Sequence, residues 1–297
     1  MDATAHRLGS TMIVASAVAF GALAVFGKLA FDAGVGVVTL LFVRFAVAAA
    51  VLWAATLRAP NPLAGTGTRA VMAALALGAV GYSMQAGLFF AALERMDASL
   101  LSMVLYTYPA MVTLAAIMLG RETPSRRRIG ALMVSSGGVA LVLLGAGAHG
   151  FDWLGAAMGI GAALTYSAYI LVSDHVTVHV PPLPLSALVT TGAAVTFGAA
   201  GVATGSLETG FAGAGWGWLA AIALVSTVTP VLLFFAGMRR VGPSMAAILS
   251  TLEPPTTVLL AFLAFGQSPT AIQLAGGALV LAAVVLLQQR PAAAAAA

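Results

Sequence analysis

Residues 89–99 read FFAALERMDAS, and residues 234–244, at an offset of 145 (89 to 234), read FFAGMRRVGPS. The same offset places Pro109 on Pro254. A single offset without a gap indicates that the chain contains two copies of one structural unit. We expect the first repeat over residues 1–147, the second over 148–290, and a low-complexity, disordered tail over 291–297.

The composition around the repeats is that of an integral membrane protein. Of the 297 residues, 61% are hydrophobic and 7% are charged, and the mean hydropathy is +1.04. Soluble domains carry about 25% charged residues, so most of this surface must face lipid. The chain has no Cys and no basic stripe, although its net charge is +4. We therefore expect the lipid bilayer as a partner, and no nucleic acid, cofactor or metal.

Glycines, prolines and charges divide the chain into ten apolar segments, each near the roughly 20 residues that cross a bilayer as a helix. Five helices per repeat is an odd number, so the two repeats must enter the membrane from opposite sides. The predicted fold is an all-α integral membrane protein of ten transmembrane helices, arranged as two inverted five-helix repeats. The expected spans are roughly 9–32, 36–57, 70–93, 98–119, 127–147, 153–174, 184–205, 215–238, 244–265 and 271–289.

Basic residues gather in alternate loops, and the positive-inside rule then orients the chain with both termini cytoplasmic in the cell (inner) membrane. Arg95 is the single basic residue that falls on the expected outer side. The other outer-loop charges are acidic: Asp32, Glu94, Asp97, Asp152 and Glu208. The expected cytoplasmic set is Arg7, Arg58, Arg69, Arg121, Arg126, Arg127, Arg128, Arg239, Arg240 and Arg290.

Three stretches carry a family resemblance: LLFVRFAVAAA (40–50), LYTYPAMVTLAAIMLGRETPSRRRIGALMVSSGGVAL (105–141) and LEPPTTVLLAFLAFGQSPTAIQLAGGALVLAAVV (252–285). With the ten spans, they make the chain similar to EamA-type exporters of the drug/metabolite transporter superfamily. The resemblance implies export of amino acids, nucleosides, metabolites or drugs. The second repeat has Gly266-Gln267 where the family usually has a Gly-Glu pair, so no carboxylate role is assigned there.

Lys28, Arg44 and Glu253 are ionisable residues inside expected spans. A charge at the bilayer centre costs about 2.5–3.5 kcal/mol on insertion scales, so such residues usually face a cavity or one another. Lys28, near a helix end, either extends to the interface or attracts substrate carboxylates. Arg44 is roughly 12 Å deep at 1.5 Å per residue, and the family resemblance implies a structural pairing there, with substrate contact as the alternative.

Glu253 is followed at once by Pro254 and Pro255. Proline lacks an N–H and displaces the carbonyl four residues back, so Pro254 should leave a backbone acceptor free near Ser250. Glu253 and the free carbonyls would then hold an ammonium group. Two other readings stay open: Glu253 carries a proton, because burial favours a neutral carboxyl group, or it is a neutral or salt-bridged core residue with Arg44 or Lys28 as the partner.

Corresponding helix breaks in the two halves point to a binding site near mid-membrane, or else only shape the packing of the helices. The expected breaks are at Pro109, Pro230, Pro254 and Pro255. Polar and aromatic side chains nearby suit a mostly apolar cavity, although any one of them could simply pack. The expected substrate-binding residues are Lys28, Arg44, Tyr82, Gln85, Tyr106, Tyr108, Tyr166, Thr229, Ser250 and Glu253.

The sequence thus predicts a secondary transporter that exports small metabolites, most of all amino acids including aromatic ones, by alternating access. Protons are the candidate coupling ion. The alternatives are an exporter of nucleosides or cationic drugs, a channel, or an intramembrane enzyme. The enzyme reading lacks a His within a span to act as base, and the chain has no Walker loop for ATP.

Overall fold

The computed structural model describes residues 3–58, 60, 62–120, 125–146, 152–177, 180–241 and 249–288. Within these ranges the regular secondary structure is helical throughout, as the long apolar runs predicted. The expected tail and the Arg121-Glu122 pair lie outside the described residues.

Three of the expected spans in the first half are interrupted helices. The first breaks at Ala22, the third contains a π-helical turn, and the fourth breaks at Tyr106 and Thr107. The elements are α1 (Ala3–Gly21), α2 (Leu23–Asp32), α3 (Val37–Thr56), α4 (Thr68–Ala76), η1 (Leu77–Tyr82), α5 (Ser83–Arg95), α6 (Ala98–Leu105), α7 (Tyr108–Met118) and α8 (Arg126–Ala146).

The second half repeats the π-helical turn at the matching place. η1 ends at Tyr82, which the offset of 145 places on Thr227. η3 ends at the next residue, Val228. The elements are α9 (Trp153–Thr177), α10 (Pro182–Thr204), α11 (Gly213–Ala223), η3 (Leu224–Val228), α12 (Thr229–Val241), α14 (Glu253–Phe265) and α15 (Ala271–Gln288).

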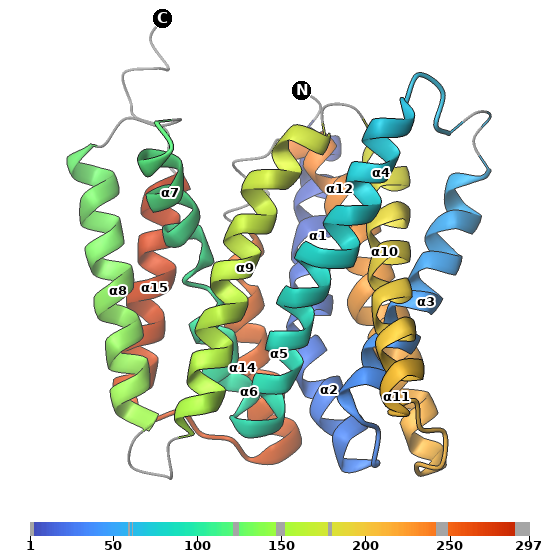
Figure 1. Cartoon of the computed structure of the whole chain (residues 1–297). Coiled ribbons are helices and arrows are strands. Elements are labelled where there is room, and N and C mark those ends of the chain that lie inside the picture. The colour runs from blue at the N-terminus through green and yellow to red at the C-terminus, as the bar shows by residue number, and fades with distance from the viewer. Residues whose placement is uncertain are drawn as a thin grey trace, which may run out of the picture.

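Seven helical stretches among the described residues are long and apolar enough to cross a membrane. Three shorter apolar helices, Ile129–Gly145, Glu253–Phe265 and Ala271–Leu286, fall in the other three expected spans. The chain is therefore an all-helical, multi-pass membrane protein, while the count of ten spans stays a prediction. Figure 1 shows α1 beginning and α15 ending at the same end of the bundle.

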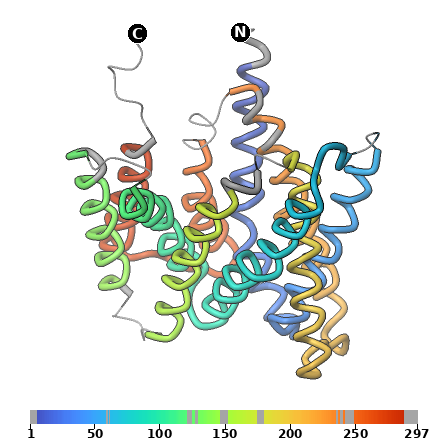
Figure 2. Tube along the Cα trace, turned by 45° about the horizontal axis from the view of Figure 1, so that its top comes forward, coloured from blue at the N-terminus to red at the C-terminus, as the bar shows by residue number. Residues whose placement is uncertain are grey.

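The helices pack mainly between the two halves of the chain. α8 packs on α15, α3 on α10, α1 on α12, α5 on α9, and α6 on α14. Figures 1 and 2 both place the α8–α15 pair at one edge of the bundle and the α3–α10 pair at the other. This set of pairs is unchanged when each span is exchanged with its counterpart in the other repeat. The pair of α1 and α12, for example, becomes the pair of α9 and the helix of η1 and α5, which is already in the set.

The contact between η1 and α10 brings two backbones together. A Cβ at Gly78 would lie 2.7 Å from the carbonyl carbon of Val189, and a Cβ at Gly192 would lie 2.8 Å from the amide nitrogen of Ala79. Only glycine tolerates such an approach. The π turn also frees a carbonyl for the neighbour, since Thr196 Oγ1 donates to the Ala79 oxygen at 2.9 Å.

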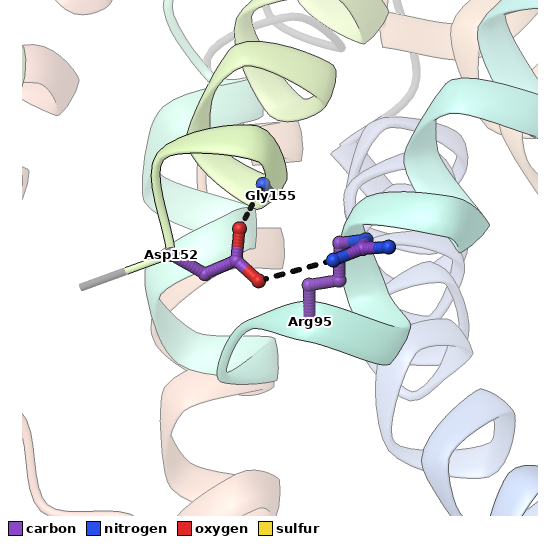
Figure 3. Close-up of polar contacts among 3 residues, drawn as sticks. All are labelled: Arg95, Asp152 and Gly155. Carbon is purple, nitrogen blue, oxygen red and sulfur yellow. Dashed lines mark hydrogen bonds and ion pairs between the residues drawn. The ribbon is translucent and has the colours of Figure 1, made fainter. Parts of the chain in front are cut away.

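The acidic loops lie together at the lower end of Figure 1, where α2 meets α3, α5 meets α6 and α10 meets α11. Arg95, the exception to the charge pattern, reaches Asp152 at 3.3 Å in an ion pair at this end (Figure 3). Asp152 also accepts the Gly155 N–H at 2.8 Å, so it caps the start of α9. That N–H bond, and next the Arg95 guanidinium, lower the pKa of Asp152.

Candidate functional site

A cavity of about 380 Å³ lies between the two halves of the bundle. A smaller lobe of about 120 Å³ adjoins it and contains Arg44, Gln85, Ser102 and Thr257. Together the two lobes take side chains from both repeats, which is where inverted-repeat transporters bind their substrates. The residues that line both lobes are Phe20, Tyr82, Tyr106, Tyr108, Tyr166 and Glu253.

All five tyrosines of the chain line the larger lobe. Their rings form a continuous series in which neighbouring ring centroids are 4.6–6.1 Å apart. The series starts beside Glu253 and ends beside Arg44, in the order Tyr106, Tyr108, Tyr166, Tyr169 and Tyr82. The cavity therefore joins a carboxyl group to a guanidinium along an aromatic wall.

Glu253 is the first residue of α14, and Pro254 and Pro255 occupy the first turn that follows it. Proline is well placed in a first helical turn because no intrahelical partner is needed there for its missing N–H. The Ser250 carbonyl, four residues before Pro254, accepts the Tyr106 hydroxyl at 2.7 Å. The same hydroxyl lies 3.0 Å from Glu253 Oε2.

Tyr106 owes its position to a matching break in the first half. α6 ends at Leu105 and α7 begins at Tyr108, with Pro109 in its first turn. Tyr106 and Thr107 lie between these two helices. The offset of 145 assigns them to the two residues directly before α14, where the helix of the second half is also broken. The two breaks thus meet across the cavity through the Tyr106 hydroxyl.

The open reading in which Glu253 pairs with Arg44 or Lys28 finds no support. Within the described part of the chain, the one ion pair within 4.0 Å is that of Arg95 and Asp152. Glu253 is a half-buried residue that lines the cavity.

Arg44 is 3% exposed and is held by polar and aromatic partners instead of a carboxylate. Its Nε donates to Thr227 Oγ1 at 2.9 Å, and its Nη2 donates to the Tyr82 hydroxyl at 3.4 Å. Its guanidinium also lies 4.9 Å and 5.5 Å from the ring centroids of Phe45 and Phe90, within the range of cation–π attraction.

The two hydrogen-bond partners of Arg44 occupy equivalent positions of the repeat. Tyr82 ends η1, Thr227 lies in η3, and the two residue numbers differ by 145. π-helical turns of this kind occur often at functional sites, because they turn a side chain away from the regular helical face. One buried cation is thus held by the same position of each half.

The structure brings together most, but not all, of the side chains expected at the site. Gln85, 8% exposed, lines the smaller lobe, and Ser250 lines the larger one. Lys28, on α2, and Thr229, at the start of α12, line neither lobe. The π turn just before Thr229 changes the helix face, so Thr227 points to the cavity in its place and Thr229 is exposed.

Pro230 also differs from the expectation of a broken helix. The chain stays helical from Gly213 to Val241, and Pro230 is the second residue after the π turn of η3. The wider π turn accommodates the proline ring that an α-helix would reject. The buried Pro230 carbonyl accepts Ser16 Oγ from α1 at 2.8 Å, so this segment is fixed rather than interrupted.

Several lining residues were not among the expected ones, including Phe20, Tyr169, Thr190 and Phe234. They come from spans one, six, seven and eight. Phe20 and Phe234 look like ordinary lipid-soluble residues in the sequence, and only the pairing of α1 with α12 brings both to the cavity. Tyr169 could be found from its sequence, since it lies one helical turn after the expected Tyr166 and is an aromatic residue of the same span.

Comparison with known proteins gives the family. The model of the EamA-like transporter family matches residues 7–144 and again residues 153–288. The chain belongs to the EamA-like transporter family. Two copies of the family unit therefore make up the protein, as the internal repeat indicated.

The relatives of this EamA-like protein carry general names. An "Uncharacterized transporter" of Archaeoglobus fulgidus (strain ATCC 49558 / DSM 4304 / JCM 9628 / NBRC 100126 / VC-16) is 27% identical over 194 residues, 65% of this chain and 68% of its own length. An "Uncharacterized transporter YcbK" of Bacillus subtilis (strain 168) is 25% identical over 277 residues, 90% of this chain and 88% of its own. A solved crystal structure covers 97% of both chains with a TM-score of 0.62 and 18% identity, which shows a shared fold.

Proposed function

We propose that this EamA-like protein is a secondary transporter that exports amino acids, including aromatic ones, from the cytoplasm by alternating access. The observation that carries the proposal is the central cavity, in which the Glu253 carboxyl group begins an aromatic wall that ends at Arg44. Its volume of about 380 Å³ lies within the range of small-molecule sites, roughly 300–1,000 Å³.

The chemistry of the two ends suits a zwitterion. At one end, Glu253 and the Ser250 carbonyl offer oxygen acceptors to an ammonium group. At the other end, Arg44 places a positive charge beside Tyr82 for a carboxylate. The tyrosine rings between them supply a flat, apolar surface for an aromatic or aliphatic side chain.

We propose further that the chain has ten spans, with an inverted arrangement of repeats 1–147 and 148–290. Support comes from helix contacts that are unchanged when the halves are exchanged, and from π turns and helix breaks at matching positions. The charge pattern supports cytoplasmic termini and a place in the cell (inner) membrane. The termini lie at the same end of the bundle as the loop after α3, which carries Arg58, and the opposite end of the bundle carries the acidic loops.

Organic cations and nucleosides are the competing substrate classes. A cationic drug would use Glu253 and the tyrosines but would gain nothing from Arg44. A nucleoside would stack on the rings but would offer no ammonium group to Glu253. The three classes therefore differ in which charged residue they require.

Transport into proteoliposomes tests the proposal. Labelled amino acids, nucleosides and a quaternary ammonium dye are presented to the wild type, to Glu253→Gln and to Arg44→Met. We expect saturable, competed uptake of amino acids in the wild type and a loss of at least tenfold in each variant. Uptake of the dye that survives Arg44→Met, or of nucleosides that survives Glu253→Gln, would move the assignment to that class. Circular dichroism and gel filtration of each variant give the folding control.

A further inference from the structure

A further pocket, with a volume of about 490 Å³, lies between α14 and α15 and shares only Tyr106 with the lobes of the central cavity. We propose that this pocket binds one acyl chain of a bilayer phospholipid, and that the end of the chain reaches the wall of the central cavity at Tyr106. The inference concerns a lipid, so it does not depend on which substrate the central cavity carries. Its support comes from helix packing, from the lining of the pocket, and from the surface on which the pocket opens.

The pocket exists because α14 and α15, which follow each other in the chain, pack mainly on other helices. α14 packs on α1 and α6, and α15 packs on α8. In the first half their counterparts by the offset of 145, α7 and α8, pack on each other. The same offset places Gly277 and Ala278, which line the pocket, on Leu132 and Met133 of α8. The second half therefore has less side-chain volume at this place, and a space remains between its last two helices.

The lining of the pocket suits hydrocarbon better than water. Among the described residues that line it, Tyr106 and Ser268 alone carry polar side chains. The Tyr106 hydroxyl is engaged with the Ser250 carbonyl and with Glu253, and Ser268 Oγ donates to the Gly266 carbonyl at 3.4 Å. A water molecule in a cavity needs about two to four polar partners, so water gains little here. An apolar chain would instead make dispersion contacts along the whole wall.

The pocket opens on a surface that faces the bilayer. Leu259 and Phe262 of α14 and Leu274 of α15 belong to its wall, and each is about half exposed. Leu263 continues this exposed apolar surface next to Phe262. The molecules that cover such a surface in a membrane are lipids, whose chains form a hydrocarbon core about 30 Å thick. The wall of the pocket is thus continuous with the lipid interface, and the adjacent source of an occupant is an acyl chain.

The pocket has the length of an acyl chain in one leaflet. It runs from Ser268 and Pro269, in the loop at the acidic end of the bundle, to Tyr106 and Pro254 at the two helix breaks (Figure 1). From Pro254 to Phe262, α14 rises roughly 12 Å at 1.5 Å per residue, compared with about 15 Å for half of the hydrocarbon core. A chain that enters near the loop therefore ends against Tyr106, which separates it from the central cavity.

Photolabelling in proteoliposomes tests the site. A phosphatidylcholine with a diazirine at the end of one acyl chain is mixed into the bilayer, and the labelled residues are identified by mass spectrometry of peptides. Met103 lines the pocket but is only 6% exposed, so we expect label on it when a chain lies inside. Met133, which is 71% exposed on α8 outside the pocket, reports contact with the surrounding bilayer. Label on Met133 without label on Met103 would overturn the proposal, because it would show contact with the surrounding lipid only.

A substitution that fills the pocket provides a second test. Ala278 is exposed on α15 and lines the pocket, so the ring of Ala278→Trp should occupy the space of the acyl chain. Ala275→Trp is the matched control, because Ala275 is exposed on the same helix but does not line the pocket. We expect the label on Met103 to be lost in Ala278→Trp and kept in Ala275→Trp, with unchanged label on Met133 in both. Persistence of the Met103 label in a folded Ala278→Trp would refute the site. Gel filtration gives the folding control, and the label on wild-type Met103 decides the question if Ala278→Trp does not fold.

Competition separates a lipid from a transported molecule. Amino acids and the quaternary ammonium dye are added to the proteoliposomes during labelling, and we expect neither to change the label on Met103. Displacement of the label by either compound would assign the pocket to a substrate and overturn the proposal. Failure of amino acid transport would remove the proposed function, while the lipid site would stand on its own label.

Discussion

The seam between η1 and α10 gives a quantitative prediction about stability. Gly78→Ala would add a methyl group where it meets the backbone of Val189, at 2.7 Å from the carbonyl carbon and 2.8 Å from Cα. Backbone atoms cannot turn aside as a side chain would, so the overpacking cost should be near the upper end of the usual 1–3 kcal/mol. Alanine recovers up to about 1 kcal/mol of helix propensity. The net loss is about 2 kcal/mol, roughly a 30-fold fall in the ratio of folded to unfolded protein.

Gly137→Ala is the matched control for this prediction. Gly137 lies in α8, and a Cβ there would meet no atom within 4 Å. It should gain helix propensity without overpacking, so its stability should equal or exceed that of the wild type. The free energy of unfolding of both variants is measured by reversible titration with a denaturing detergent. Equal stabilities for Gly78→Ala and Gly137→Ala would refute the close contact of η1 with α10.

Two further predictions concern the polar contacts. Thr227→Val removes the acceptor of Arg44 Nε and should lower the free energy of unfolding by about 1.5–3 kcal/mol, the usual value for a hydrogen bond to a charged group. Thr229 is exposed, so Thr229→Val should stay within about 0.5 kcal/mol of the wild type in the same titration. Similar losses for the two variants would contradict the structure at η3. Asp152 has a folded-state pKa below its unfolded value of about 3.9, so its contribution to stability is present above that pH and is lost as the pH falls through the folded pKa. Asp152→Asn should abolish this acid-dependent loss of stability. Arg95→Gln should keep most of it, because the hydrogen bond from the Gly155 N–H is the first cause of the lowered pKa of Asp152. A series of thermal melts across acidic pH checks both variants, and a stability of Arg95→Gln that does not change with pH would show that the ion pair dominates instead.

The sequence predicted much of the fold because its signals are local and repeated. Long apolar runs separated by charges give the helices, and a fixed offset of 145 residues gives the two repeats. The acceptor freed near Ser250 follows from proline chemistry alone, and the structure supplies the Tyr106 hydroxyl as its donor.

The site was harder to predict because it depends on helix pairing and on π turns. Nothing in TVTP distinguishes Thr227 from Thr229, since one extra residue in the turn of η3 decides which side chain faces the cavity. Arg44 was expected to make a structural pairing or to contact substrate, with Glu253 as one possible partner. Its partners are instead a threonine, a tyrosine and two phenylalanine rings. These contacts join residues from both halves, which no local pattern encodes.

The central claim is that Glu253 holds the amino group of the substrate, and a double-substitution cycle tests it most directly. Binding of phenylalanine and of its deaminated analogue, phenylpropionate, is measured by calorimetry for the wild type and for Glu253→Gln. We predict that the wild type prefers phenylalanine by at least tenfold and that Glu253→Gln does not distinguish the two ligands, because the same contact is removed from either side. An equal preference for phenylalanine in both proteins would contradict the claim and place the amino group elsewhere in the cavity.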